Sequence, residues 1–187
     1  VGAICILGVI FSPWLVGLVT QGWVRTAPEK YQQAVLLTQI MFPFLLLVAL
    51  AAQAMGILNA LNQFAVPAFS STWFNVGSVV AGIGIGFGLG PTLGIEPIVG
   101  MAIGVVIGGA LQLAWQIPSL YRAGFSYRPA FDFNHPGLRH IYRLMGPAII
   151  GNASVQINVL VNTFFATSIS DPFRGLDGPT AWLNYAF

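Results

Sequence analysis

Long apolar runs, separated by short polar stretches, set the pattern of this chain. Five runs are predominantly apolar: residues 1–20, 34–58, 68–89, 97–121 and 138–169, and a sixth begins at Thr180. A helix of about 20 predominantly apolar residues is long enough to cross a bilayer. The pattern therefore predicts about five full membrane-spanning helices and the start of a sixth.

Polar residues and helix-breaking residues predict where the first spans end. Pro13 interrupts the first span, and residues 21–33, QGWVRTAPEKYQQ, are predicted to form a polar loop after it. The uncharged residues 31–95 are too many for one crossing, so the chain must turn within them. Asn, Gln and Pro gather at residues 59–67, and Pro67 suits the first turn of a new helix. We expect the turn there.

Composition agrees with a membrane protein. Hydrophobic residues make up 56% of the chain, charged residues 6%, and the mean hydropathy is +0.80, whereas soluble domains carry about 25% charged residues. The predicted fold class is therefore all-α, a polytopic helical membrane protein. Because the chain begins and ends inside apolar runs, we expect an internal fragment of a longer protein, with residues 1–20 a true span and not a signal peptide.

The few charged residues predict an orientation. Residues 122–136 and the helix start after them hold one acid, Asp132, against the basic residues Arg122, Arg128, Arg139 and Arg143. Cytoplasmic loops carry an excess of Lys and Arg, so this basic connector is expected in the cytoplasm. Alternation of the spans then places residues 25–30 and 171–177 on the outer side.

A glycine-rich stretch raises the question of nucleotide binding. Its glycines stand at positions 82, 84, 86, 88, 90 and 94. Neither the spacing of a dinucleotide-binding fingerprint nor the Gly-Lys-Ser/Thr of a P-loop occurs there. Spacings of four, at 82, 86 and 90, at 84 and 88, and at 100, 104 and 108, instead predict close packing of two helices. We expect a tight hairpin of the third and fourth spans, with Gly90 and Pro91 closing the third.

Polar side chains within this hairpin admit two interpretations. They lie on one face of each span and comprise Ser71, Asn75 and Ser78 in the third, and Gln112, Gln116 and Ser119 in the fourth. Polar groups are costly in hydrocarbon and tend to face a partner, water or a substrate path. Both patches fall at a similar depth, so mutual hydrogen bonding between the spans is favoured over a substrate role.

The fifth span differs because its polar residues fall on two separate sides. At about 100° per residue, one stripe holds Asn152, Gln156, Thr163 and Thr167, and the other holds Gly151, Ser154, Asn158 and Asn162. Either one stripe packs against protein while the other lines a wet cavity, or both bond neighbouring helices. Gly146 and Pro147 predict a hinge or kink near the start. Arg139, His140 and Arg143 just before them serve as topology markers.

Residues for catalysis are missing from the spans. Their middles hold no Asp, Glu, Lys or Arg, and the chain shows no carboxylate pair, no His/Cys/Asp cluster and no nucleophile with a base. Cys5 stands alone in an apolar run, where an inert buried thiol is expected. The arginines form no face for nucleic acid. The sequence therefore gives no support to an enzyme and predicts no cofactor, metal or nucleic-acid partner.

Two runs of residues carry a resemblance to a known family. The first, MFPFLLLVALAAQAMGILNALNQFAVPAFSSTWFNVGS, resembles the MurJ (MviN) family of proposed lipid II flippases through Phe42-Pro43-Phe44, residues 56–60, Phe64, Pro67-Ala68-Phe69 and Asn75. The second, GPAIIGNASVQINVLVNTFFATSI, is similar to the family's seventh helix through Pro147-Ala148, Gly151, Gln156-Ile157 and Asn162-Thr163. AWLNYAF looks like the start of the eighth. The outer loop SDPFRGLDGP departs from the family by its length and charge.

The resemblance implies a fold of two pseudo-symmetric lobes around a central cavity, in a superfamily that also contains MATE exporters and polysaccharide flippases. Residues 1–121 would supply four helices of the N-terminal lobe, and residues 122–136 the basic cytoplasmic connector between the lobes. Residues 137–187 would supply the first helix and the start of the second helix of the C-terminal lobe.

The function that the resemblance implies is translocation of lipid II from the inner to the outer leaflet of the bacterial inner membrane by alternating access. Candidate substrate-binding residues are then Gln156, Asn158 and Asn162, with Arg139 and Arg143 for pyrophosphate at the cavity mouth. The implied partners are lipid II, membrane lipids, and cell-wall synthesis and division proteins. A drug exporter or polysaccharide-lipid flippase of the same fold, and a non-transporting membrane scaffold, stay open as alternatives.

Overall fold

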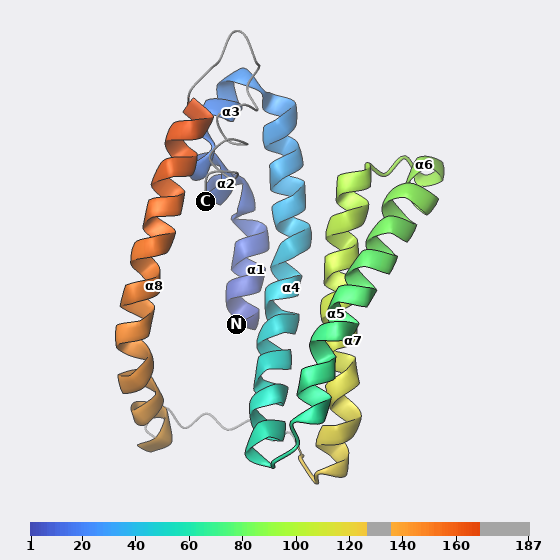
Figure 1. The fold of residues 1–187 in the computed structure, drawn as a ribbon. Helices are drawn as coiled ribbons and strands as arrows, with labels where there is room; N and C mark the ends of the chain where they lie inside the picture. Colours follow the sequence, from blue (N-terminus) through green and yellow to red (C-terminus); the bar gives the residue numbers. More distant parts are fainter. Residues whose placement is uncertain (127–135, 169–187) are drawn as a thin grey trace. The chain divides into compact units, whose positions relative to one another are not determined.

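The computed structural model describes residues 1–126 and 136–168, and every regular element in these ranges is helical (Figure 1). The elements in chain order are α1 (Gly2–Ile10), α2 (Ser12–Val19), α3 (Gln21–Thr26), α4 (Pro28–Ala60), α5 (Ala65–Ile83), the π-helical segment η1 (Gly84–Leu89), α6 (Gly90–Leu93), α7 (Pro97–Arg122) and α8 (Pro136–Ser168).

Four of these helical stretches are long and apolar enough to cross a membrane. They are α4, α5 with its continuation to Leu93, α7 and α8. The number rises to five if α1 and α2 are counted as one broken span. The all-α, polytopic fold class is thus confirmed. The predicted sixth span, from Thr180, lies outside the described residues, as does most of the connector at 122–136.

The prediction of a polar loop at residues 21–33 is wrong, because all of these residues except Ala27 are helical. They form α3 and the beginning of α4, which starts at Pro28 with Glu29 in its first turn. Proline fits the first turn of a helix, where its missing N–H leaves no bond unmade, and an acidic side chain there faces the positive end of the helix dipole. Polar composition here accompanies a short helix and the first turns of a long one, and not a loop.

The ends of two other spans also differ from expectation. The first span breaks at Phe11, since α1 ends at Ile10 and α2 begins at Ser12, so Pro13 lies in the first turn of α2. The third span does not close at Gly90 and Pro91, which open α6 instead. The helix ends at Gly94, whose φ of 66° is left-handed. Glycine adopts this conformation readily, which suits it to a helix end.

Residue contacts divide the chain into two compact units. One comprises Val1–Pro13 and Gln33–Ser126, and the other comprises Trp14–Gln32 and Tyr127–Phe187, of which residues 136–168 are described. The first unit holds α1, most of α4 and the α5–α7 hairpin. The second holds most of α2, α3 and α8, and α3 lies against α8.

The predicted hairpin of α5 and α7 is confirmed, and glycines form its contact (Figure 1). A Cβ atom added at Gly104 would overlap the backbone of Gly82, and one added at Gly100 would overlap Gly86. The backbones therefore approach as closely as the small-residue spacing predicts. The second row differs, because a Cβ at Gly84 or at Gly88 would meet nothing within 4 Å.

Two phenylalanines of α4 fasten this helix to its neighbours within the first unit. The ring of Phe42 occupies the place of a Cβ on Gly8 of α1. The ring of Phe44 lies 2.8 Å from a Cβ placed on Gly109 of α7, and it stacks on Phe74 of α5 with 5.6 Å between ring centroids. The two phenylalanines of the Phe-Pro-Phe run thus occupy two different helix crossings.

The predicted turn between the second and third spans is confirmed. Helix α4 ends at Ala60 and α5 begins at Ala65, with Asn62 in a left-handed conformation at φ 57°. Asn is one of the few residues other than glycine that tolerates this region. Pro67 lies buried in the first turn of α5, where the sequence places it.

Candidate functional site

The polar patch of the α5–α7 hairpin is not a network between the two helices. Ser78 donates to the carbonyl of Phe74 at 2.7 Å, and Asn75 donates to the carbonyl of Ser71 at 3.0 Å. Among the described residues these bonds stay within one helix, so the expected mutual hydrogen bonding is wrong. The reason is that short polar side chains reach the carbonyl one turn back more readily than a neighbouring helix.

Gln116 is the buried polar residue of this patch. Its side chain is fully buried, its Nε2 donates to the carbonyl of Gln112 at 3.3 Å, and its Oε1 has no partner among the described residues. An unsatisfied buried acceptor costs about 1–3 kcal/mol. Because Gln116 is closed off, its own side chain offers no surface to a substrate, whereas Ser71 and Asn75 of the same patch are exposed.

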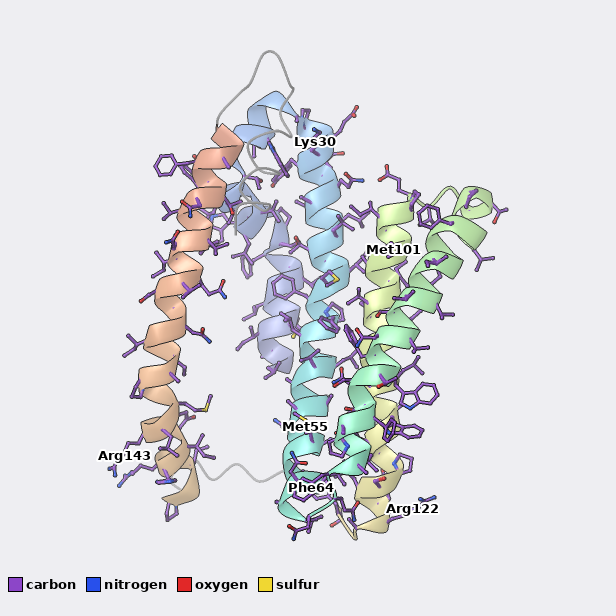
Figure 2. All side chains as sticks on the ribbon, in the orientation of Figure 1. Lys30, Met55, Phe64, Met101, Arg122 and Arg143 are labelled. Carbon is purple, nitrogen blue, oxygen red and sulfur yellow. The ribbon has the colours of Figure 1, made fainter. Side chains whose placement is uncertain are left out.

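All five residues predicted to bind substrate lie on α8. This helix runs unbroken from Pro136 to Ser168 with Pro147 inside it, so Gly146 and Pro147 do not end it. Arg139, Arg143, Gln156 and Asn158 are exposed, and Asn162 is half-buried. Side chains project from α8 along its whole length, and Arg143 lies near its N-terminal end (Figure 2).

The five residues do not gather at one point. At about 100° per residue, the arginines share one side of α8 with Asn158 and Asn162, within about 140°, while Gln156 lies about 160° from Asn158. At about 1.5 Å per residue, Arg143 and Asn158 stand about 22 Å apart along the axis. The first group is therefore a stripe with cations at one end and amides toward the other, and Gln156 belongs to the opposite side.

The amides of the stripe bond each other. Nδ2 of Asn162 donates to Oδ1 of Asn158 at 2.5 Å. This leaves the amide nitrogen of Asn158 as a donor and the amide oxygen of Asn162 as an acceptor. The pair can thus bind a ligand that both donates and accepts hydrogen bonds, such as a sugar hydroxyl or a peptide group, without adding charge.

Other polar side chains of α8 are satisfied by their own helix. Thr163 donates to the carbonyl of Val159 at 2.8 Å, and Ser154 donates to the carbonyl of Ile150 at 3.3 Å. Large apolar side chains on α8 are exposed as well, with Ile150 at 72%. The exposed surface of α8 thus carries both polar and large apolar side chains.

No metal site is present in the described residues. They contain no group of three His, Cys, Asp or Glu side chains close enough to hold a metal ion. Cys5 is a free, buried thiol in α1, as the sequence leads us to expect. The described chemistry is thus that of amides, hydroxyls and arginines on membrane helices.

These features define the class as a polytopic helical membrane protein whose spans pack through small residues and carry neutral polar stripes. Residues 1–186 match the family described as lipid II flippase MurJ, and the chain belongs to this family.

Named relatives agree with this assignment. The chain is 34% identical over 181 residues to the probable lipid II flippase MurJ of Buchnera aphidicola, covering 97% of the chain and 33% of that protein. It is 34% identical over 189 residues to the probable lipid II flippase MurJ of Vibrio cholerae, covering 98% and 34%. It is 28% identical over 185 residues to the lipid II flippase MurJ of Burkholderia cenocepacia, covering 97% and 34%. The chain thus spans about a third of the length of these relatives.

Proposed function

We propose that the whole protein to which this chain belongs is a lipid II flippase of the bacterial cytoplasmic membrane. It would move the undecaprenyl-pyrophosphate-linked precursor from the inner to the outer leaflet by alternating access, with no chemical step. The family and the relatives' names support this proposal. In such a cycle the substrate stays near a fixed polar site while the two lobes rock around it.

The stripe on α8 is the observation that carries the proposal. Arginines bind pyrophosphate through charge-assisted hydrogen bonds, which makes Arg139 and Arg143 the candidates for first contact with the headgroup. Asn158 and Asn162 supply neutral donors and acceptors further along the same side. A headgroup that leaves the arginines would thus meet groups that hold it without a strong charge, and release on the far side becomes possible.

The lobe boundaries belong to the same proposal. Residues 1–121 would lie in one lobe and residues 137–187 in the other, with the basic residues 122–136 as the cytoplasmic link. Its support is the excess of arginine around the link, which favours the cytoplasmic side. The inner end of α8, with Arg139 and Arg143, would then open toward the leaflet in which lipid II is made.

Depletion of the full-length protein in its own bacterium tests the proposal. An externally added enzyme that cleaves lipid II then reports the fraction that has reached the outer leaflet. We expect lipid II to accumulate and to become protected from this enzyme. Unchanged accessibility, in a strain shown to lack a second flippase, would contradict lipid II transport and favour another cargo or a scaffold.

Substitutions then test the stripe itself. Replacing Asn158 and Asn162 together by Ala in the full-length protein should lower transport about tenfold or more, since each lost hydrogen bond contributes about 0.5–1.5 kcal/mol. Gln53→Ala is the matched control, because Gln53 is an exposed amide within the α4 span. Equal transport by the double variant and the control, at equal protein level, would remove the two asparagines from the site.

A further inference from the structure

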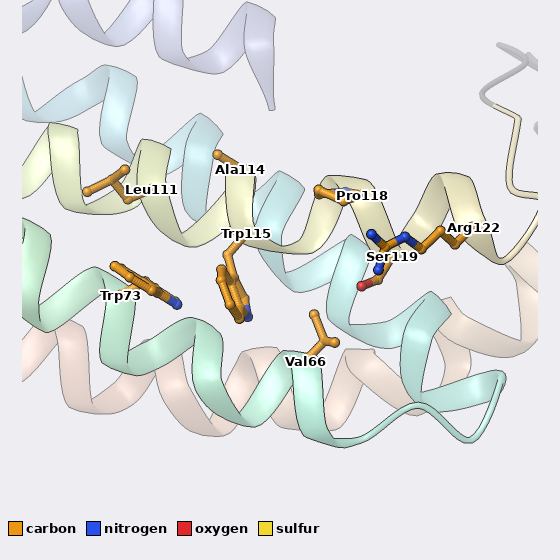
Figure 3. A pocket seen from close by; sticks show the side chains of 8 residues that line it. All are labelled: Val66, Trp73, Leu111, Ala114, Trp115, Pro118, Ser119 and Arg122. Atoms are coloured by element: carbon orange, nitrogen blue, oxygen red, sulfur yellow. The ribbon is translucent and has the colours of Figure 1, made fainter.

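A pocket of about 580 Å³ lies between α5 and α7, apart from the candidate residues on α8. Its lining is apolar except at one end, where a hydroxyl and a guanidinium stand (Figure 3). The lining residues are Val66, Trp73, Leu111, Ala114, Trp115, Pro118, Ser119 and Arg122. This volume is within the range of small-molecule sites, about 300–1,000 Å³.

Two tryptophans form the middle of the pocket. The rings of Trp73 and Trp115 lie 5.1 Å apart with 36° between their planes, and the two side chains are 41% and 42% exposed. Figure 3 shows them between Leu111 at one end and Ser119 and Arg122 at the other. Aromatic rings of this size offer large apolar faces, against which an acyl chain can pack.

The pocket has the length of one leaflet. Leu111 and Arg122 are separated by about 16 Å along α7, at about 1.5 Å per residue. Half of a hydrocarbon core about 30 Å thick is about 15 Å. Because Arg122 ends α7, the apolar part of the pocket extends from the membrane surface to about the middle of the bilayer.

The charge at the Arg122 end of the pocket is unpaired within the described residues. Arg122 makes no ion pair or hydrogen bond there, and α7 carries no acidic residue. The nearest carboxylate along this helix, Glu96, precedes its opposite end, about 39 Å away at 1.5 Å per residue. An apolar transmembrane helix in the pocket would cover the tryptophans but would itself supply no anion to the guanidinium.

We propose that this pocket binds one glycerophospholipid of the leaflet that borders the 122–136 connector. The phosphodiester accepts hydrogen bonds from the guanidinium of Arg122 and the hydroxyl of Ser119, and an acyl chain lies over Trp115, Trp73 and Leu111. Two features argue for a lipid: the positive charge of Arg122 complements a phosphate, and the length of the pocket matches that of one leaflet. This lipid is a resident of the fold and not the transported cargo.

Photocrosslinking of the full-length protein in bilayers tests this site. The probe is a phosphatidylglycerol with a diazirine in its acyl chain, and the crosslinked residues are mapped by mass spectrometry. We expect labels on the pocket residues of α5 and α7. Arg122→Gln should lower this labelling about fivefold, equivalent to about 1 kcal/mol, and Arg122→Lys should retain most of it.

Three controls separate the lipid site from a general effect on the fold. A diacylglycerol with the same photoreactive chain lacks the phosphate, so Arg122→Gln should not change its labelling. Trp115→Ala should lower the labelling by both probes, whereas Ile117→Ala, at a side chain 39% exposed on the same helix, should not. Gel filtration establishes that each variant is folded, and transport is not the readout.

Two results would overturn the proposal. One is equal phosphatidylglycerol labelling in the wild type and Arg122→Gln. The other is capture of a protein segment, in place of a phospholipid, by a photoreactive amino acid placed at position 115. Either result would leave the proposed transport function untouched, because it concerns a different surface.

Discussion

At the scale of single residues, glycines allow the backbones of α5 and α7 to approach each other closely. Gly82 meets Gly104, Gly86 meets Gly100, and a Cβ on Gly108 would lie 2.6 Å from the carbonyl oxygen of Phe74. Lipid provides no hydrophobic driving force for helix association, so close van der Waals contact supplies much of the stability. A methyl group at Gly86, Gly100, Gly104 or Gly108 would therefore overlap the facing backbone, whereas one at Gly82 would first meet the flexible side chain of Met101, at 3.0 Å.

Gly104→Ala should destabilise the full-length protein by about 1–3 kcal/mol, because the new methyl group overlaps the backbone of α5. Gly56→Ala is the matched control, since a Cβ there meets nothing within 4 Å. In a helix interior it should be neutral or stabilising by up to about 1 kcal/mol. Thermal unfolding in detergent measures both. Equal melting of the two variants would show that the glycine contact contributes little.

Which glycines pack could be predicted only in part from the sequence. Spacing of four occurs in two rows, and nothing in the spacing distinguishes Gly82 and Gly86, which pack, from Gly84 and Gly88, which do not. That choice depends on where α7 lies. The prediction that Ser78 and Asn75 bond to the other helix is wrong because each side chain bonds to a carbonyl of its own helix. The sequence pattern shows which face a polar residue occupies but not which partner it chooses.

At the scale of elements, α4 is held to its neighbours by the two phenylalanines that flank Pro43. Pro43 itself is exposed, whereas Phe42 and Phe44 face different helices. Residues two apart on a helix differ by about 200° in direction, so one short run can reach two crossings. The Phe-Pro-Phe run is thus explained by packing, with no role in substrate binding required.

Phe44→Ala should cost about 2–4 kcal/mol, because it removes a ring that fills the space beside Gly109 and stacks on Phe74. Leu45→Ala, at a neighbouring side chain 50% exposed, should cost less than about 1 kcal/mol. The measurement is again thermal unfolding of the full-length protein. Similar losses for the two variants would contradict the contact described for Phe44.

The spans themselves were predictable from sequence, and their ends were not. Long apolar runs predict α4, α5, α7 and α8, because a helix that crosses a bilayer needs about 20 predominantly apolar residues in sequence. The ends depend on single backbone conformations, such as Gly94 at φ 66° in place of Gly90 and Pro91. The helical repeat predicts Asn158 and Asn162 on one side of α8 and Gln156 on the other. The hydrogen bond between the two asparagines could not be predicted from this repeat, because it depends on their side-chain conformations.

At the scale of the molecule, the basic connector sets a testable orientation. Thr92 and Ser126 lie beyond opposite ends of α7, which at about 1.5 Å per residue is about 39 Å long and exceeds the hydrocarbon thickness. With Cys5 and any other cysteine removed, cysteine is placed at either position in the full-length protein in intact cells. An impermeant maleimide should label Thr92→Cys and not Ser126→Cys. The reverse pattern would invert the topology.

One contact at the Glu96 end of the hairpin is insensitive to the salt concentration around it. Gln33 on α4 donates a hydrogen bond to the carboxylate of Glu96, at the start of α7. An ion pair at an exposed site weakens as salt rises, because mobile ions screen it. A neutral amide on a carboxylate is a short-range, directional bond and depends far less on screening. If this end faces outward, the hydrogen bond between α4 and the hairpin persists as the ionic strength outside the cell changes.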